Sequence, residues 1–197
     1  MSLPEETGYW DKQWQERTKT EVVSRNRGKF SKIISELWKR PHYSKLTKLD
    51  IGCGPAEHAY EMKKLYCDWV VDYTGLELSQ VCVNKALEKF NIVIAKKDIY
   101  NYTSTFNYGL FLLLDTLEHI EFPDKLAMKI KELSTEKFYI FGNVPLYPSD
   151  PSADGGFEKP MDIRDISKFV SQCGCKKLWY EVYGINGYPY LIWEGKT

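Results

Sequence analysis

Apolar residues recur at helical spacing near the beginning of the chain, at Phe30, Ile33, Ile34, Leu37 and Trp38. The pattern stops at Pro41, so it predicts an amphipathic helix over residues 22–40. The apolar stripe of such a helix needs a surface to cover. We therefore divide the chain into an N-terminal arm and helix, residues 1–41, and a main domain, residues 42–197, on which they pack. Together they form a single compact unit.

After residue 42 the pattern alternates between short apolar runs and amphipathic stretches. The runs predict strands over residues 46–51, 72–78, 91–97, 109–114, 137–144, 177–185 and 188–193. The stretches between them predict helices, of which one is capped by Ser79, one covers residues 122–133 and one is capped by Asp162. This alternation predicts an α/β fold with a seven-stranded, mostly parallel sheet and helices on both faces. Only Gly187 and its neighbours separate the last two strands, so the last strand should be antiparallel.

Acidic residues stand where the first predicted strands end. Residues 49–56 read Leu-Asp-Ile-Gly-Cys-Gly-Pro-Ala, which places an acid and two glycines at the end of the first strand. Glycine lets a backbone turn tightly around a ligand, because no Cβ stands in the way. The second strand ends on Glu77, the third on Asp98 and the fourth on Asp115. Acids at successive strand ends suit a ligand with several hydroxyl and amino groups, such as a nucleoside.

In this pattern the chain resembles the class I S-adenosylmethionine-dependent methyltransferases, which have a Rossmann-like fold. Asp50, Gly52 and Gly54 match the family's first motif, although Ala56 replaces its third glycine. Glu77 matches the acid that binds both ribose hydroxyls, and Asp98 matches the acid that reads the adenine amine. The resemblance implies a cofactor site made of Asp50, Gly52, Cys53, Gly54, Glu77, Leu78, Asp98, Ile99 and Leu114. The cofactor would be S-adenosylmethionine and the product S-adenosylhomocysteine.

The resemblance also implies an activity, the transfer of a methyl group to an oxygen or nitrogen of a small molecule. Residues 114–119, Leu-Asp-Thr-Leu-Glu-His, match the family's fourth motif. A general base is needed only if the acceptor arrives protonated, and His119 is the candidate. His119 could equally cap or pack at a helix start without touching substrate. Candidates for acceptor binding lie outside the motifs: Tyr9, Trp10 and Trp14 on the arm, Arg25 or Arg27 on the first helix, Asn143 after the fifth strand, and Tyr147 in the loop that follows.

The nearest rival is a dinucleotide-binding domain with the fingerprint G-x-G-x-x-G. At the third glycine of that fingerprint this chain has Glu57. A carboxylate at a helix start would repel the pyrophosphate of a dinucleotide, whereas a sulfonium nucleoside has no phosphate and is itself a cation. The sequence therefore favours S-adenosylmethionine over a nicotinamide cofactor.

Composition and charge limit the remaining possibilities. The 197 residues balance 27 basic against 27 acidic side chains, but residues 1–48 carry a net charge of +5. This balance argues against a long nucleic acid as the main partner, while the basic N-terminal stretch leaves a tRNA or protein acceptor open. A methyltransferase-like binding module without turnover is a further alternative. No run is apolar enough to span a membrane, and five cysteines without a C-x-x-C pair suggest reduced thiols, no metal and a cytoplasmic location. The acceptor and the oligomeric state are not predicted.

Overall fold

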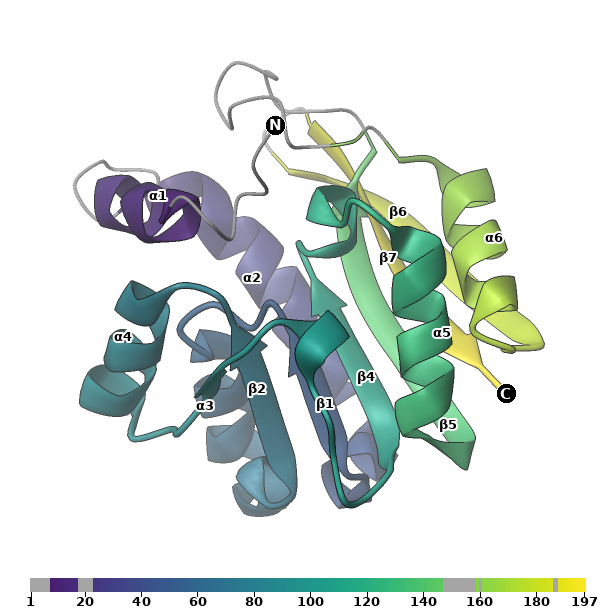
Figure 1. Ribbon diagram of the computed structural model, residues 1–197. Helices are drawn as coiled ribbons and strands as arrows, with labels where there is room; N and C mark the ends of the chain where they lie inside the picture. Colours follow the sequence, from purple (N-terminus) through teal and green to yellow (C-terminus); the bar gives the residue numbers. More distant parts are fainter. Residues whose placement is uncertain (1–7, 18–22, 147–158, 160, 186–187) are drawn as a thin grey trace.

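The strands form one mixed sheet, as the computed structural model shows for residues 8–17, 23–146, 159, 161–185 and 188–197 (Figure 1). The strands are β1 (Lys48–Ile51), β2 (Tyr73–Glu77), β3 (Ala95–Lys96), β4 (Tyr108–Leu114), β5 (Ser134–Pro145), β6 (Lys177–Ile185) and β7 (Tyr188–Lys196). Their order in the sheet is β3-β2-β1-β4-β5-β7-β6. The pairs from β3 to β5 are parallel, and β7 is antiparallel to both β5 and β6. The predicted seven-stranded sheet with one antiparallel strand is confirmed.

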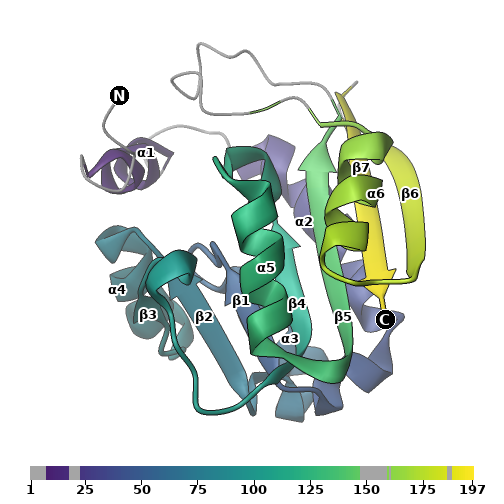
Figure 2. The same ribbon diagram turned by 45° about the vertical axis from the view of Figure 1, so that its right-hand side comes forward.

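Helices cover both faces of the sheet, as predicted. They are α1 (Tyr9–Arg17), α2 (Val23–Trp38), α3 (Glu57–Leu65), α4 (Gln80–Phe90), α5 (Pro123–Leu133) and α6 (Ile163–Gln172), with short 3₁₀ turns η2 (Pro41–Lys45), η3 (Cys67–Val70), η4 (Ile99–Asn101) and η5 (Leu117–His119). Helices α5 and α6 cover one face of the sheet, and α2, α3 and α4 cover the other (Figure 2). Their buried side chains belong to two separate apolar layers, one on each face. No helix among the described residues is both long enough and apolar enough to cross a bilayer.

The central strand β4 contributes side chains to both apolar layers, one on each face of the sheet. Six of its seven residues are buried, as expected for a parallel strand covered on both sides. Alternate side chains point to opposite faces, so Phe111 and Leu113 join the layer of α5 and α6, while Leu110 and Leu112 join that of α2 and α3. Burial of these side chains fixes the strand's register, and with it the position of Asp115 at the strand's end.

The local signals at helix ends are confirmed. The Ser79 hydroxyl accepts a hydrogen bond from Cys82 N at the start of α4, and Asp162 forms a capping box with Asp165 at the start of α6. Gly174, with a φ of +88°, ends the turn that follows α6. These caps satisfy backbone groups that a helix end leaves without partners.

The third strand is shorter than predicted. The expected strand over residues 91–97 is wrong in extent, because only Ala95 and Lys96 pair with β2. Asn91 instead takes a left-handed conformation and ends α4. The apolar residues that suggested a strand, Ile92 and Ile94, are buried against the neighbouring helix and strand rather than hydrogen-bonded in the sheet.

The N-terminal helix α2 is part of the core. Ile33 and Leu37 are almost fully buried in the same apolar layer as α3. Two ion pairs also attach this part of the chain to the last two strands. Arg40, which follows α2, has its Nε 2.5 Å from Glu194 Oε2 of β7. Lys32 Nζ of α2 lies 2.7 Å from Glu181 Oε1 of β6. The helix therefore holds a fixed position relative to the strands whose ends carry the predicted site.

Candidate functional site

The chain turns sharply after β1 in the left-handed backbone region. Gly52 has a φ of +70°, Gly54 of +54° and Ala56, which precedes α3, of +56°. Only glycine adopts this region freely, and at Gly52 a Cβ would also lie 2.9 Å from the Thr116 side chain. The backbone N–H groups of Gly52 and Cys53 donate to Leu76 O on β2. Both predicted glycines are thus needed for the turn, and Gly52 is also needed for close contact with Thr116 after β4.

Glu77, at the end of β2, faces this turn. Its Oε2 accepts a hydrogen bond of 2.8 Å from Gly54 N, and its Oε1 accepts from Leu78 N and Ser79 N, both at 2.9 Å. Burial raises the pKa of Glu77 above its ordinary value, and the three backbone hydrogen bonds oppose that rise. The structure therefore brings the predicted acid and the predicted glycine turn into direct contact.

Asp50 lies deeper than the other predicted residues. Its side chain is fully buried, and its Oδ2 accepts a 2.6 Å hydrogen bond from the Tyr73 hydroxyl and lies 2.6 Å from His58 Nε2. Asp50 Oδ1 is also buried and has no hydrogen-bond partner among the described residues. Asp50 Oδ2 therefore links β1 to β2 and α3, while Oδ1 has no hydrogen-bond partner in the described part of the chain.

The other predicted cofactor residues lie around this centre. Asp98 caps η4, accepting from Tyr100 N at 3.0 Å, and Ile99 beside it is buried. Leu78 and Leu114 are partly buried at the ends of β2 and β4. The Cys53 side chain points into the core, where its sulfur would lie 2.8 Å from a Cβ at Gly75, so only its backbone belongs to the turn.

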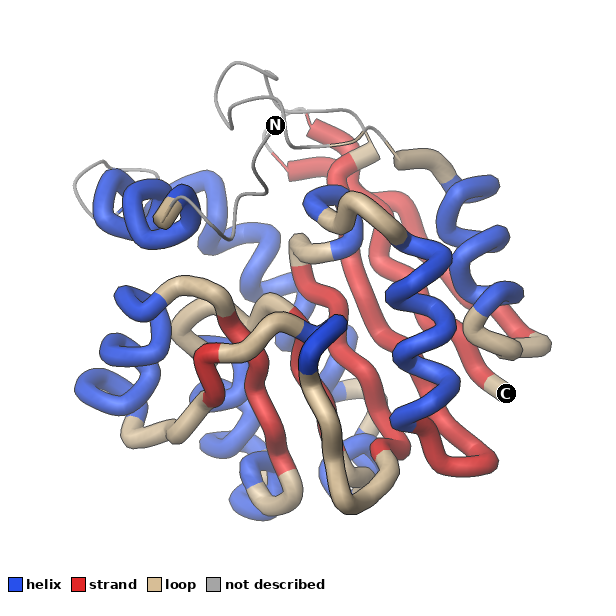
Figure 3. The backbone as a smooth tube through the Cα atoms, in the orientation of Figure 1, coloured by secondary structure: helices blue, strands red, loops and turns tan. Residues whose placement is uncertain are grey.

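Helix α1 lies beyond the ends of the strands (Figure 3), and its Trp14 lies against the glycine turn. A Cβ at Gly54 would lie 3.1 Å from Trp14 Cζ2. Asp11 Oδ1 accepts from the Ser79 hydroxyl at 2.6 Å and from Val81 N at 3.1 Å, which attaches α1 to the start of α4. The Trp10 ring meets the His119 ring edge to face, with centroids 5.2 Å apart. The arm residues Trp10 and Trp14 thus lie at the site, and so does Asp11, which the sequence did not single out.

A second cluster, from four elements, stands at the ends of β4 and β5. Asp115, with a φ of +50°, receives a 2.6 Å hydrogen bond from Asn143 Nδ2 and lies 2.5 Å from Lys29 Nζ of α2. The Lys29 ammonium also lies 5.2 Å above the Tyr190 ring of β7. A non-glycine residue held in the left-handed region is often a functional position. Asn143 was predicted; Lys29 was not, because its only signal in the sequence is one basic residue among eleven in the N-terminal stretch.

Of the remaining candidates, some lie beside the arm and others lie outside the described residues. His119 ends η5, is partly buried and contacts Trp10, and Tyr9 packs edge to face on Trp10. Arg25 and Arg27 belong to α2, but their side chains lie outside the described residues, as does Tyr147. The structure therefore groups His119 with the arm, and leaves the arginines and Tyr147 as sequence-based expectations.

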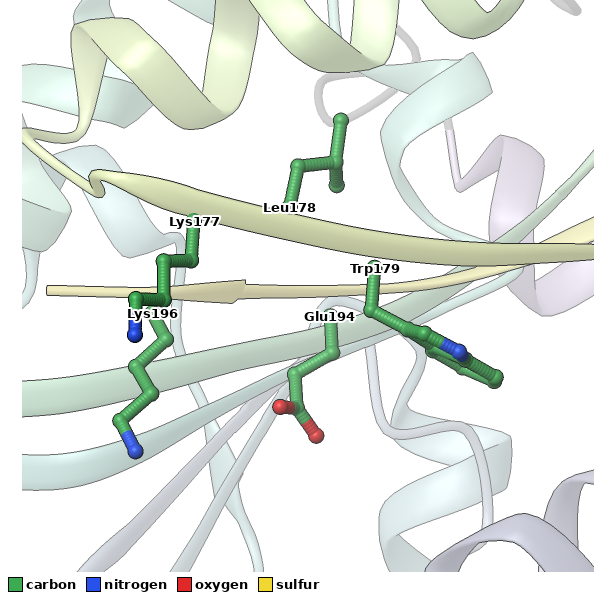
Figure 4. Close-up of a pocket in the computed structure, with 5 residues that line it drawn as sticks. All are labelled: Lys177, Leu178, Trp179, Glu194 and Lys196. Carbon is green, nitrogen blue, oxygen red and sulfur yellow. The ribbon is translucent and has the colours of Figure 1, made fainter.

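Two further observations concern a surface pocket and possible metal ligands. A surface pocket lined by Lys177, Leu178, Trp179, Glu194 and Lys196 lies on β6 and β7 (Figure 4). Lys196 pairs with Tyr139 and Glu194 pairs with Phe141, so the pocket lies beside the middle of β5, before the strand reaches Asn143. In the described part of the chain, no group of three or more His, Cys, Asp or Glu side chains could hold a metal ion.

Comparison with known proteins gives a fold but no sequence relative. No protein-family model matches the chain, and no curated protein matches its sequence. Among solved structures, magnesium protoporphyrin IX methyltransferase (ChlM) from Synechocystis PCC 6803 with bound SAH is similar, with a TM-score of 0.72, 15% identity and 95% of both chains covered. A possible histamine N-methyltransferase from Thermotoga maritima has a TM-score of 0.71 at 10% identity, covering 95% of this chain and 97% of that one.

A third similar structure is the plantazolicin methyltransferase BpumL in complex with SAH, with a TM-score of 0.66, 16% identity and coverage of 98% of this chain and 96% of that one. All three are methyltransferases, and ChlM and BpumL were crystallised with SAH. At these identities the likeness concerns the fold. Together with the strand order and the glycine turn, it shows that this chain has the class I S-adenosylmethionine-dependent methyltransferase fold.

Proposed function

We propose that the protein is an S-adenosylmethionine-dependent methyltransferase that moves a methyl group to an oxygen or nitrogen of a small molecule. One observation carries this proposal: the buried Glu77 carboxylate lies against Gly54 N in the left-handed turn after β1. A buried carboxylate at that place suits a ribose diol, because each hydroxyl can donate to it, at about 1.5–3 kcal/mol for a charged hydrogen bond. The acids Asp50 and Asp98 flank it on β1 and after β3.

The chemistry of these residues fits the cofactor. Asp50 Oδ1, buried and without a hydrogen-bond partner in the described part of the chain, could accept from the cofactor's amino group. Asp98 and the buried Ile99 would receive the adenine, by hydrogen bonding and packing respectively. Glu77 already accepts three backbone hydrogen bonds, and a carboxylate has about four acceptor sites. We therefore expect a bound diol to replace at least one of them, with Gly54 N as the donor closest to the ligand.

The bound cofactor would supply a methyl group on a positively charged sulfur, ready for in-line displacement. The chain's own residues would then position the acceptor and exclude water, which can contribute up to about 7–11 kcal/mol. Trp10 and Trp14 of α1 would cover the site, and Asp115 with Asn143 would border it on the side of β5. His119 would accept a proton from an acceptor that arrives as an alcohol, phenol or ammonium.

Calorimetry with S-adenosylhomocysteine tests the cofactor assignment. Wild type should bind, and Glu77→Ala should bind about 10- to 150-fold more weakly if the equivalent of one charged hydrogen bond is lost. Asp98→Ala should also weaken binding. Glu61→Ala is the matched control, because Glu61 makes only an exposed contact with Lys64 on α3. A folded wild-type protein that fails to bind at high micromolar concentration would exclude the proposal.

Consumption of S-adenosylmethionine distinguishes a methyltransferase from a binding module of the same fold. Tight binding of S-adenosylhomocysteine, no consumption of S-adenosylmethionine with a broad set of metabolites, and co-purification of a protein partner would together favour the module. A tRNA acceptor would instead give RNA binding that weakens steeply with salt. The near-neutral charge of the whole chain favours the small-molecule acceptor.

A further inference from the structure

Lys29 is a basic residue of α2 that reaches the ends of β4 and β5. Its side chain is 16% exposed, its ammonium lies 2.5 Å from Asp115 Oδ2, and it stands over the Tyr190 ring. Asp115 is followed by Thr116, whose side chain packs against Gly52 of the cofactor turn. Lys29 therefore stands next to the predicted cofactor site, on the side where Asn143 and β5 would receive an acceptor.

The Asp115 carboxylate is already engaged at both oxygens. Oδ1 accepts from Asn143 Nδ2 at 2.6 Å, and Oδ2 faces Lys29. The Asp115 backbone N–H donates in turn to Asn143 Oδ1 at 3.3 Å. This reciprocal pairing fixes the orientation of the acid, so Asp115 serves as the counter-ion of Lys29.

The Lys29 ammonium carries more hydrogen-bond donors than its contact with Asp115 uses. An ammonium carries three donors, and Asp115 is the ion-pair partner of Lys29 in the described residues. The Tyr183 hydroxyl is buried without a hydrogen-bond partner, again among the described residues, and the Tyr183 ring stacks on Tyr190 with centroids 5.7 Å apart. Burial and the nearby charge of Asp115 raise the pKa of Tyr183, so it remains a donor. A ligand here has to bring lone pairs or negative charge, since a buried donor left without a partner is costly.

Lys29 keeps its charge throughout the physiological range. Burial alone would lower its pKa, but the ion pair and hydrogen bond with Asp115 outweigh burial and leave the pKa raised. The negative charges of Asp115 and Glu118 both act on Lys29, so its attraction for a ligand comes from short charged hydrogen bonds by the N–H donors that Asp115 does not occupy, and not from a net positive charge of the cluster.

We propose that Lys29 is a specificity-determining residue that binds an anionic oxygen of the methyl acceptor, so that the acceptors are small molecules carrying a carboxylate. The inference rests on the proposed function for the identity of the reaction, but the anion subsite can be tested by itself. Lys29 binds and orients the acceptor, and Asp115 and Asn143 hold Lys29 in place. The stacked Tyr183 and Tyr190 form the adjoining wall.

Matched pairs of acids and amides test this assignment. Benzoate and phenylacetate are titrated by calorimetry into the wild-type protein, with and without saturating S-adenosylhomocysteine, beside benzamide and phenylacetamide. The same titrations are made with Lys29→Met, with Lys29→Arg, and with Lys32→Met as control. Lys32 is on the same helix and forms ion pairs with Glu181 and Glu36, and its ammonium lies 5.9 Å from the centroid of the Tyr183 ring, so it serves as a nearby cation that is not paired with Asp115. Circular dichroism establishes that each variant is folded.

We expect the acids to bind at least tenfold more tightly than their amides, and this preference to disappear in Lys29→Met while it persists in Lys29→Arg and Lys32→Met. If Lys29→Met does not fold, the double variant Lys29→Met/Asp115→Asn, which leaves no unpaired charge, replaces it. Equal binding of acids and amides, no binding of either, or equal losses in Lys29→Met and Lys32→Met would overturn the inference. Failure of S-adenosylhomocysteine to bind wild type would instead count against the proposed function, because the acid and amide titrations without it still report on Lys29.

Discussion

Trp14 of α1 lies directly over Gly54 of the cofactor turn, so that a Cβ at Gly54 would lie 3.1 Å from Trp14 Cζ2 and 3.2 Å from Cη2. This contact joins the N-terminal arm to the loop after β1, across 40 residues of sequence. It makes the absence of a side chain at Gly54 necessary for two reasons: the left-handed backbone and the indole above it.

Gly54→Ala should therefore cost more stability than the backbone conformation alone explains. An alanine in the left-handed region costs about 1–2 kcal/mol, and crowding against Trp14 adds to this. Gly8→Ala is the matched control, because Gly8 has a similar φ of +63° with no atom within 4 Å of a Cβ. In a double-mutant cycle by urea denaturation, Trp14→Ala should relieve part of the Gly54→Ala cost. Strict additivity would contradict the contact.

Binding of S-adenosylhomocysteine should weaken at mildly acidic pH. Glu77 accepts hydrogen bonds from both hydroxyls of a diol most strongly when it is ionised, and burial raises its pKa above the ordinary 4.5. As the pH falls through this raised pKa, the carboxylate takes up a proton and the dissociation constant rises. Calorimetry between pH 5 and 8 should show this rise in wild type, starting at a higher pH than an ordinary glutamate would give. Glu77→Gln should bind weakly with little pH dependence; parallel pH profiles would rule out Glu77 as the titrating group.

Asp11 should hold α1 against the rest of the molecule. Partial burial alone would raise its pKa, but hydrogen bonds from Ser79 and Val81 N lower it below 3.8. Its contribution is therefore present at neutral pH and is lost only as the pH falls through that lowered value. Asp11→Asn should reduce the free energy of opening of α1 by about 0.3–1 kcal/mol, measured by hydrogen exchange at neutral pH. Lys12→Ala, at an exposed neighbour, should leave exchange unchanged.

Gly75 in the middle of β2 should tolerate no larger residue. A Cβ there would lie 2.6 Å from Ile94 Cγ2 and 2.8 Å from Cys53 Sγ, so Gly75→Ala should lower the free energy of unfolding by about 1–3 kcal/mol through overpacking. Gly184→Ala, on the edge strand β6 with no atom within 4 Å of its Cβ, should be neutral or slightly stabilising. Chemical denaturation of both variants checks the pair, and equal effects would be inconsistent with the packing described.

Lys48 should make stability depend on pH in the alkaline range. Its side chain is fully buried, its ammonium donates to the carbonyl oxygens of Ser44, Leu46 and Val71, and burial lowers its pKa to about 8 against the attraction of Asp72 and Asp68. Between pH 8 and the ordinary value of 10.5 the unfolded chain binds a proton that the folded chain has released, so the folded state gains stability as the pH rises.

The measurement is the difference in the free energy of unfolding between wild type and Lys48→Met. This difference should shift in favour of wild type from pH 8 to 10.5. The difference between wild type and Lys63→Met, at an exposed position on α3, should stay flat, which removes the contribution of tyrosines and cysteines common to all three proteins. A flat profile for Lys48→Met would show that its pKa is not lowered.

The parts of the site that could be predicted from sequence are those determined by neighbours along the chain. The glycines after β1 and the acid ending β2 are tied to strand ends, and strand ends follow from apolar periodicity. The internal pairing of Asp50 with Tyr73 and His58, and the reach of Lys29 to Asp115, depend on side chains brought together only by the fold. The short β3 was missed because buried side chains at Ile92 and Ile94 give the same apolar pattern whether or not the backbone pairs.

The position of β7 in the sheet makes other parts of the fold depend on it. β7 follows β6 along the chain but lies between β5 and β6 in the sheet. Because β6 pairs with β7 and not with β5, the native position of β6 depends on β7 lying beside β5. Tyr190, which underlies Lys29, and Glu194, which binds Arg40, belong to the same strand. The acceptor side of the proposed site and the anchoring of α2 thus both require β7 to be in place.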